Sequence, residues 1–151
     1  MIVSKKSKYA MRAVFSLAKR FGEGPVKIAD IAEEQSIPPR FLEVILSQLK
    51  QGGFVDSRRG SEGGYFMVTP PDQLSVGKIL RFFDALKEPV ECMGDNPKEK
   101  CDLKANCVFM PLWEDLSAAI SGVFDSTTFQ DLILKEKEKK DCGAKSLSYV
   151  I

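Results

Sequence analysis

The sequence predicts a mainly α-helical protein with one small β-hairpin between its helices. Three observations predict this fold class: apolar residues recur at helical spacing along several segments, two short strand-like segments enclose a glycine-rich turn, and a long apolar helix follows a cysteine-rich loop. With 151 residues, of which 44% are hydrophobic, the chain is long enough for one domain with an accessory element.

The composition narrows the class of function. The chain has no apolar run long enough to span a membrane, and its first residues lack the apolar region of a signal peptide, so we expect a cytoplasmic protein with reduced cysteines and no membrane partner. Residues 1–60 contain 11 Lys/Arg and 6 Asp/Glu, whereas residues 61–151 contain 11 and 15, which indicates an anionic partner for the first part. The absence of histidine removes the commonest catalytic bases, and we expect no enzyme.

The first helix is predicted from an apolar stripe near the N-terminus. Its members recur at every fourth position: Tyr9, Ala13, Leu17 and Phe21. Ser4 or Ser7 can cap its start, and Gly22 ends it. Lys5 and Lys8 crowd the first turns, where the helix dipole favours anions. We therefore expect Lys5, Lys8 and Tyr9 to contact a phosphate backbone.

Two short amphipathic helices joined by a tight turn come next. The first has Ile28 and Ile31 on its apolar face, and the second begins at the pair Pro38–Pro39, since proline is tolerated in a first helical turn. The apolar stripe of the second helix is Phe41, Leu42, Ile45, Leu46 and Leu49. This spacing is typical of a helix-turn-helix, although any helical hairpin can imitate it.

Two polar residues lie near the N-terminal end of the second helix, the end that enters the major groove of DNA. Arg40 could bind guanine O6 and N7, and Glu43 could accept a hydrogen bond from cytosine N4. A solvent-facing role for Glu43 is the alternative.

A β-hairpin directly follows, which makes the motif a winged helix. Phe54–Arg58 and Tyr65–Thr69 read as strands around a glycine-rich turn that begins with Arg59. We expect Arg58 to contact phosphates and Arg59 to reach a minor groove. A surface hairpin with two solvated arginines is the alternative.

The remaining elements complete the predicted organisation. Ser75 caps a helix that runs to about Leu86, a loop follows, a long helix runs from Val108 to about Phe124, and a short helix comes after it. The long helix has too much apolar surface for one buried face, so part of it is expected to pack against a second copy. The predicted regions are a winged-helix domain (1–86), a cysteine loop (87–107), a dimerisation helix with a short helix (108–134), and a charged, flexible tail (135–151).

The loop contains Cys92, Cys101 and Cys107, spaced C-x8-C-x5-C. Thiolates are soft ligands suited to zinc or iron–sulfur clusters. A zinc site normally needs four ligands, and no histidine can be the fourth, so three thiolates fit a cluster better, because a cluster accepts a non-cysteine ligand. Redox-active free thiols, a zinc site and inert thiols are the alternatives, and Cys142 is taken as a bystander.

The chain resembles the IscR, NsrR and RirA group of bacterial winged-helix regulators, the Rrf2 family. The resemblance extends over roughly Ser4 to Leu134 and rests on five matching segments: Ser4–Ala10, Ile28–Ala32, Phe41–Leu49, Val55–Tyr65 and Leu112–Ser117. It implies a homodimer that pairs through the long helix and binds a palindromic operator in double-stranded DNA, as a repressor or an activator. It also implies an iron–sulfur cluster on the three cysteines that modulates this binding.

The fourth cluster ligand departs from the family patterns. IscR-type members use a histidine three residues after the last cysteine, where Met110 stands here, and NsrR-type members use an aspartate where Lys8 stands. A small molecule such as water or a thiol is a candidate, as are the side chains Glu91, Asp95, Glu99, Asp102 and Cys142. The three-cysteine pattern resembles RirA-type members, and a [4Fe–4S] cluster is preferred to [2Fe–2S].

Three functions are therefore weighed. The first is a transcriptional regulator that senses iron, redox state or nitric oxide through a cluster. The second is a regulator of the same fold without a cluster, which responds to a metabolite, a partner protein or thiol oxidation. The third is a small redox enzyme or cluster carrier, which would leave the basic helix-turn-helix and the wing without a role.

Overall fold

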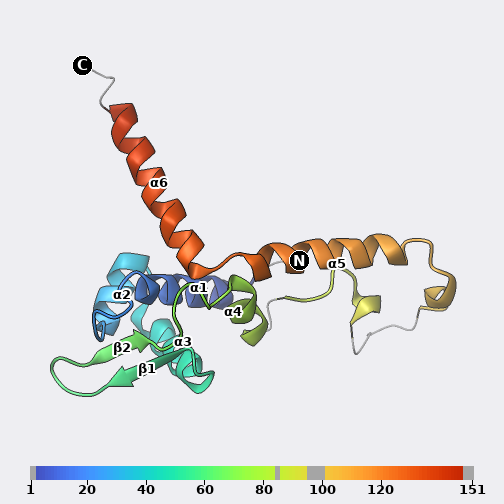
Figure 1. The fold of residues 1–151 in the computed structure, drawn as a ribbon. Helices are drawn as coiled ribbons and strands as arrows, with labels where there is room; N and C mark the ends of the chain where they lie inside the picture. The colour runs from blue at the N-terminus through green and yellow to red at the C-terminus, as the bar shows by residue number, and fades with distance from the viewer. Residues whose placement is uncertain (1–2, 84–85, 95–100, 148–151) are drawn as a thin grey trace.

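The computed structural model describes residues 3–83, 86–94 and 101–147, and it confirms a mainly helical chain with a two-stranded antiparallel hairpin. The first three helices are α1 (Lys5–Ala18), α2 (Ile28–Gln35) and α3 (Pro39–Gln51), followed by strands β1 (Val55–Arg58) and β2 (Gly64–Met67). The remaining elements are helix α4 (Val76–Phe82), the short 3-10 turns η1 (Glu91–Met93) and η2 (Lys104–Asn106), and helices α5 (Met110–Ser126) and α6 (Phe129–Leu147). Figure 1 shows the winged helix at one end, with α5 and α6 leaving it in different directions.

The hydrophobic core lies among α1, α2, α3, the base of the hairpin and the start of α6. Small residues such as Ala10 and Ala13 on α1 are completely buried and allow close packing against Leu42 and Leu46 of α3. Phe129 brings the first turn of α6 into the same core. The core therefore holds the helix-turn-helix and α6 together as one unit.

Local signals in the sequence explain where several helices begin. Ser4 caps α1, because its hydroxyl accepts a hydrogen bond from the backbone N–H of Ser7 at 3.1 Å. Ser75 caps α4 in the same way through Lys78. Between α2 and α3 the backbone of Ser36 is left-handed (φ 50°), which makes the turn of the helix-turn-helix tight.

Two residues that the sequence placed on apolar helical stripes are exposed. Helix α1 ends at Ala18, so Phe21 lies beyond it with 43% of its surface accessible. Phe41 is 63% exposed on α3 because Leu42, Ile45 and Leu46 already fill the core side of that helix. The prediction of a buried Phe41 was wrong.

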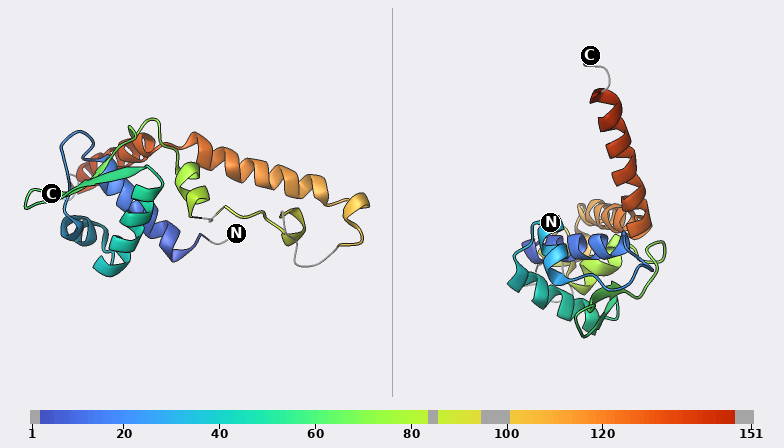
Figure 2. Two further views of the ribbon diagram at one scale, coloured as in Figure 1. Left: turned by 90° about the horizontal axis from the view of Figure 1, so that it is seen from below. Right: turned by 90° about the vertical axis from the view of Figure 1, so that its left-hand side faces the viewer.

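The last two helices also differ from the expectation. The predicted long helix is α5, and none of its residues, all of which the structure describes, is buried. The predicted short helix is α6, which continues from Phe129 through the charged run Lys135–Lys140 to Leu147. Glu136 and Lys140 lie four residues apart on this helix and form an ion pair at 3.5 Å. The left view of Figure 2 shows α5 extended away from the winged helix.

A compact joint fixes the base of α5 to α4. Arg81 donates two hydrogen bonds to the carboxylate of Asp125, at 2.5 and 2.7 Å, and lowers the pKa of Asp125. A Cβ at Gly77 would lie 2.1 Å from Asp125 Oδ1, so this approach requires glycine. The backbone N–H of Val76 donates to the carbonyl of Thr127 at 2.9 Å.

None of the helices in the described ranges is long and apolar enough to cross a bilayer.

Candidate nucleic-acid interface and cysteine loop

The solvent-exposed face of helix α3 carries both polar and apolar side chains. Arg40 and Glu43, the two residues predicted to contact bases, are both exposed. The opposite face is buried in the core, so α3 cannot turn without disrupting the packing of Leu42 and Leu49. Proline at the first helical position gives α3 a fixed starting direction.

The N-terminal turns of α1 carry the predicted phosphate contacts. Lys5 and Lys8 are exposed, and no acidic residue lies in the first turn to neutralise them. Lys5 Nζ lies 5.7 Å from the ring centre of Tyr9, which is half-buried against the core. Helix α1 packs against both α3 and β2, so these side chains belong to the same rigid body as α3 and the hairpin.

The hairpin holds the two predicted arginines. Arg58 is the last residue of β1, and its guanidinium lies 5.4 Å from the ring centre of Phe66 on the neighbouring strand. Arg59 follows at the start of the turn and is exposed. A cation–π contact therefore directs Arg58, whereas Arg59 extends from the turn into solvent.

One connection joins the hairpin to α3, and a second joins it to the segment between α1 and α2. Lys50 Nζ, near the end of α3, lies 3.0 Å from Asp56 Oδ1 and donates to Ser57 Oγ at 2.7 Å. On the other side, the backbones of Val26 and Tyr65 exchange hydrogen bonds of 2.7 and 2.9 Å. The structure therefore joins the helix that carries Arg40 and the turn that carries Arg59 into one surface of fixed geometry.

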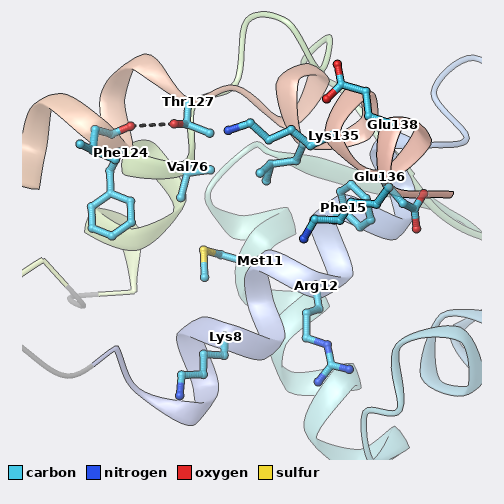
Figure 3. A pocket seen from close by; sticks show the side chains of 13 residues that line it. Lys8, Met11, Arg12, Phe15, Val76, Phe124, Thr127, Lys135, Glu136 and Glu138 are labelled. Carbon is cyan, nitrogen blue, oxygen red and sulfur yellow. Dashed lines mark hydrogen bonds between the residues drawn. The ribbon is translucent and has the colours of Figure 1, made fainter. Parts of the chain in front are cut away.

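An open apolar groove of about 800 Å³ runs between α1, the α4–α5 joint and α6. Its floor includes Met11, Phe15 and Phe124, and Lys8 and Arg12 lie on its α1 side (Figure 3). The rim on α6 includes Lys135 and Lys139, next to Glu136 and Glu138. The groove is continuous with the exposed apolar side of α5, because Val123 and Phe124 belong to both.

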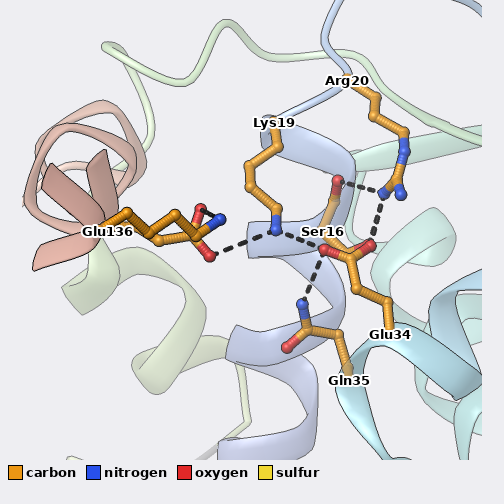
Figure 4. Close-up of polar contacts among 7 residues, drawn as sticks. Ser16, Lys19, Arg20, Glu34, Gln35 and Glu136 are labelled. Carbon is orange, nitrogen blue, oxygen red and sulfur yellow. Dashed lines mark hydrogen bonds and ion pairs between the residues drawn. The ribbon is translucent and has the colours of Figure 1, made fainter. Parts of the chain in front are cut away.

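A charged cluster ties α2 and α6 to α1. Glu34 on α2 accepts hydrogen bonds from Ser16 Oγ and Arg20 Nη1, each at 2.7 Å, and pairs with Lys19 (Figure 4). Partial burial raises the pKa of Glu34, but the hydrogen bonds from Lys19, Ser16 and Arg20 outweigh it and lower the pKa to about 2. Lys19 also lies 3.5 Å from Glu136 on α6. Sequence reasoning missed this cluster, whose members lie far apart along the chain.

The three loop cysteines do not converge in the structure. Cys92 is half-buried in η1, Cys101 is exposed, and Cys107 is half-buried after η2. All are free thiols, as is exposed Cys142 on α6, and within the described ranges no three Cys, Asp or Glu side chains form a group that could hold a metal ion. The segment with Cys101 and Cys107 lies at the end of α5 farthest from the winged helix (Figure 1).

Two candidates for a fourth ligand in the described residues, Asp102 and Cys142, lie on different segments of the chain. Asp95 and Glu99 lie outside the described residues, whereas Asp102 is exposed and follows Cys101 directly. Met110, at the position of the family histidine, begins α5 three residues after Cys107. The three thiols suit an iron–sulfur cluster because they are soft sulfur donors. Their positions in this structure do not bring them together.

Comparison with known proteins gives one consistent family. A family model described as Rrf2, iron-dependent transcriptional regulator, matches residues 3–135. The HTH-type transcriptional regulator IscR of Aliivibrio salmonicida (strain LFI1238) is 36% identical over 134 residues, which cover 89% of this chain and 78% of that protein.

Two solved structures have the same fold over most of their length. The structure of IscR from T. potens has a TM-score of 0.73 and 33% identity, and the match covers 92% of this chain and 90% of that one. The structure of CymR, described as the global cysteine regulator of B. subtilis, has a TM-score of 0.71 and 32% identity, with 87% and 95% covered.

Proposed function

This chain belongs to the Rrf2 family of iron-dependent transcriptional regulators, and we propose that it acts as a homodimer that binds a palindromic operator in double-stranded DNA. It is a transcriptional regulator and not an enzyme. The observation that carries the proposal is the surface on which Lys50 joins α3 to the hairpin with the arginine-bearing turn, while the Val26–Tyr65 bridge joins the same hairpin to the segment before α2.

The residues of this surface divide into two kinds of contact. Arg40 and Glu43 extend from the exposed side of α3 and would read base edges in the major groove. Lys5, Lys8 and Arg58, with the hydroxyl of Tyr9, would position the protein on phosphates, and Arg59 would enter the adjacent minor groove. In each role, the hydrogen-bonding groups of the side chain are complementary to the base edge or phosphate that the side chain would contact.

The exposed apolar surface of α5 supports the homodimer. Leu112 is 56% exposed and Leu116 is 42% exposed, and both lie on a helix that buries no residue against its own chain. An apolar helix of this kind is normally covered by a partner. A second copy is the partner of this proposal, because the apolar groove beside α1 continues the same surface.

We further propose that Cys92, Cys101 and Cys107 hold an iron–sulfur cluster. Three free thiols in one loop form a soft donor set, and residues 95–100, which lie between two of them, are outside the described residues. A bound cluster would supply sensitivity to iron, oxidation or nitric oxide. A [4Fe–4S] type remains the preferred form, with the fourth ligand open.

A regulator without a cluster is the second candidate, and one observation favours it. The three thiols are separate and free in the structure, which also resembles that of the B. subtilis cysteine regulator. In this candidate the exposed Cys101 would respond to oxidation, or a metabolite or partner protein would provide the signal.

Anaerobic purification separates the two candidates. With a cluster, the protein is brown, its Mössbauer spectrum identifies the cluster type, and Cys101→Ala abolishes the visible absorption. Cys142→Ala is the matched control, because this thiol is also exposed but lies on α6, and it should leave the colour unchanged. A colourless preparation that iron and sulfide cannot reconstitute would establish the candidate without a cluster.

A further inference from the structure

The outward face of α3 carries two large apolar side chains as well as the polar pair. Phe41 is 63% exposed and Val44 is 55% exposed, although the core lies directly behind the same helix. Buried α3 side chains such as Leu42 and Ile45 face the opposite way. Neither residue belongs to the hydrophobic core.

The positions of the two residues on α3 are specific. Successive residues of an α-helix are about 100° apart, so residues separated by three or four positions are neighbours on its surface. Val44 is four residues after Arg40 and three after Phe41, and it directly follows Glu43. Val44 thus lies between Arg40 and Phe41 on the exposed face, and Glu43 lies on the other side of Arg40.

The major groove of DNA offers one apolar feature to such a patch. Thymine carries a C5 methyl group there, next to its O4 acceptor, whereas the other bases present only polar atoms or ring edges. The side chains of valine and phenylalanine lack donors and acceptors, so among base edges they can discriminate only by contact with this methyl group.

We propose that Val44, with Phe41 beside it, is a specificity-determining residue that contacts thymine methyl groups in each operator half-site. The inference rests on the proposed function and adds to it the kind of base that the centre of α3 selects. Arg40 and Glu43 then read the polar edges of neighbouring base pairs, and the apolar pair requires thymine between or beside them.

The test begins with duplexes enriched from a random-sequence pool by the full-length protein. Each thymine of the enriched site is then replaced by deoxyuridine, which removes only the methyl group. For the unaltered protein we expect binding to weaken about fourfold at one or two positions in each half-site, the effect of losing one methyl contact. For Val44→Ala we expect thymine and deoxyuridine to be bound equally at the position that Val44 contacts.

Val68→Ala is the matched control, because Val68 is 52% exposed and lies outside α3. It should keep the full difference between thymine and deoxyuridine. If no thymine is sensitive, or if Val44→Ala keeps the difference, then Val44 does not read methyl groups, although operator binding itself stands. If no sequence is enriched at all, both the proposed function and this inference fail.

Discussion

Replacing Glu34 by glutamine removes the negative charge that holds α2 and α1 together while keeping the size of the side chain. Ser16, Lys19 and Arg20 all contact this carboxylate. A hydrogen bond to a charged group contributes about 1.5–3 kcal/mol when protected from water, and an exposed ion pair less than about 1 kcal/mol. The Glu34 side chain is 23% exposed, so we expect Glu34→Gln to lower the free energy of unfolding by about 1–2 kcal/mol at pH 7.

The effect of Glu34→Gln on the free energy of unfolding should depend on pH. The pKa of Glu34 falls from 4.5 to about 2 on folding, so the ionised form stabilises the folded state at pH values above about 4.5. That contribution is lost as the pH falls from about 4.5 through 2, and below this pH the carboxylate is protonated in both states. The stability difference between the unaltered protein and Glu34→Gln should therefore shrink across this interval.

Urea denaturation of both proteins at pH 7, 4.5 and 3 measures this difference, and other titrating groups cancel because the two proteins share them. Asp56→Asn is the control, since Asp56 pairs with Lys50 at a more exposed position and should have a smaller effect. Equal stability at pH 7, or a difference that does not change with pH, would refute the assigned role of Glu34.

Three further predictions concern the wing, the core and the dimer. Arg59→Ala should weaken operator binding by about 1–3 kcal/mol in a gel shift at fixed salt, and unchanged affinity would exclude a wing contact. Phe129→Ala should lower the free energy of unfolding by about 3–5 kcal/mol, because the side chain is completely buried; a loss below about 1 kcal/mol in urea denaturation would show that α6 is not anchored there. Leu116→Asp should yield a folded monomer in sedimentation equilibrium, whereas a persistent dimer would rule out pairing through α5.

Periodicity and capping were enough to predict the winged helix. The stripes on α1 and α3, Ser75 at the start of α4 and the glycine-rich turn are local signals, and the structure places an element at each of them. The end of α1 and the length of α6 were not predicted. Apolar spacing continued past Ala18 to Phe21, and the charged run after Leu134 has no apolar stripe that would indicate a helix.

The site could be predicted only in part. The motif predicts DNA contacts for Arg40, Glu43 and Arg59, which the structure shows to be exposed, and those contacts stay a prediction. The Glu34 cluster joins three helices and leaves no pattern in the sequence. Phe41 was misplaced because an apolar residue beside a stripe looks like a member of it. Exposure in the folded chain, not residue type, separates Phe41 and Val44 from Leu42.

The length of α5 limits how a change at the cysteine loop can reach the proposed DNA-binding surface of the same subunit. Its 17 residues extend about 25 Å, whereas mobile ions screen charges over about 8 Å at physiological ionic strength. A gain or loss of charge beside Cys107 is therefore not felt electrostatically by α3 of its own chain. In the proposed regulator the signal within one subunit is therefore mechanical, and one contact that can carry it is the pair of hydrogen bonds from Arg81 to Asp125 beside Gly77. In this proposal Arg81 and Asp125 take part in coupling the cysteine loop to α3, although neither residue lies in that loop or on α3.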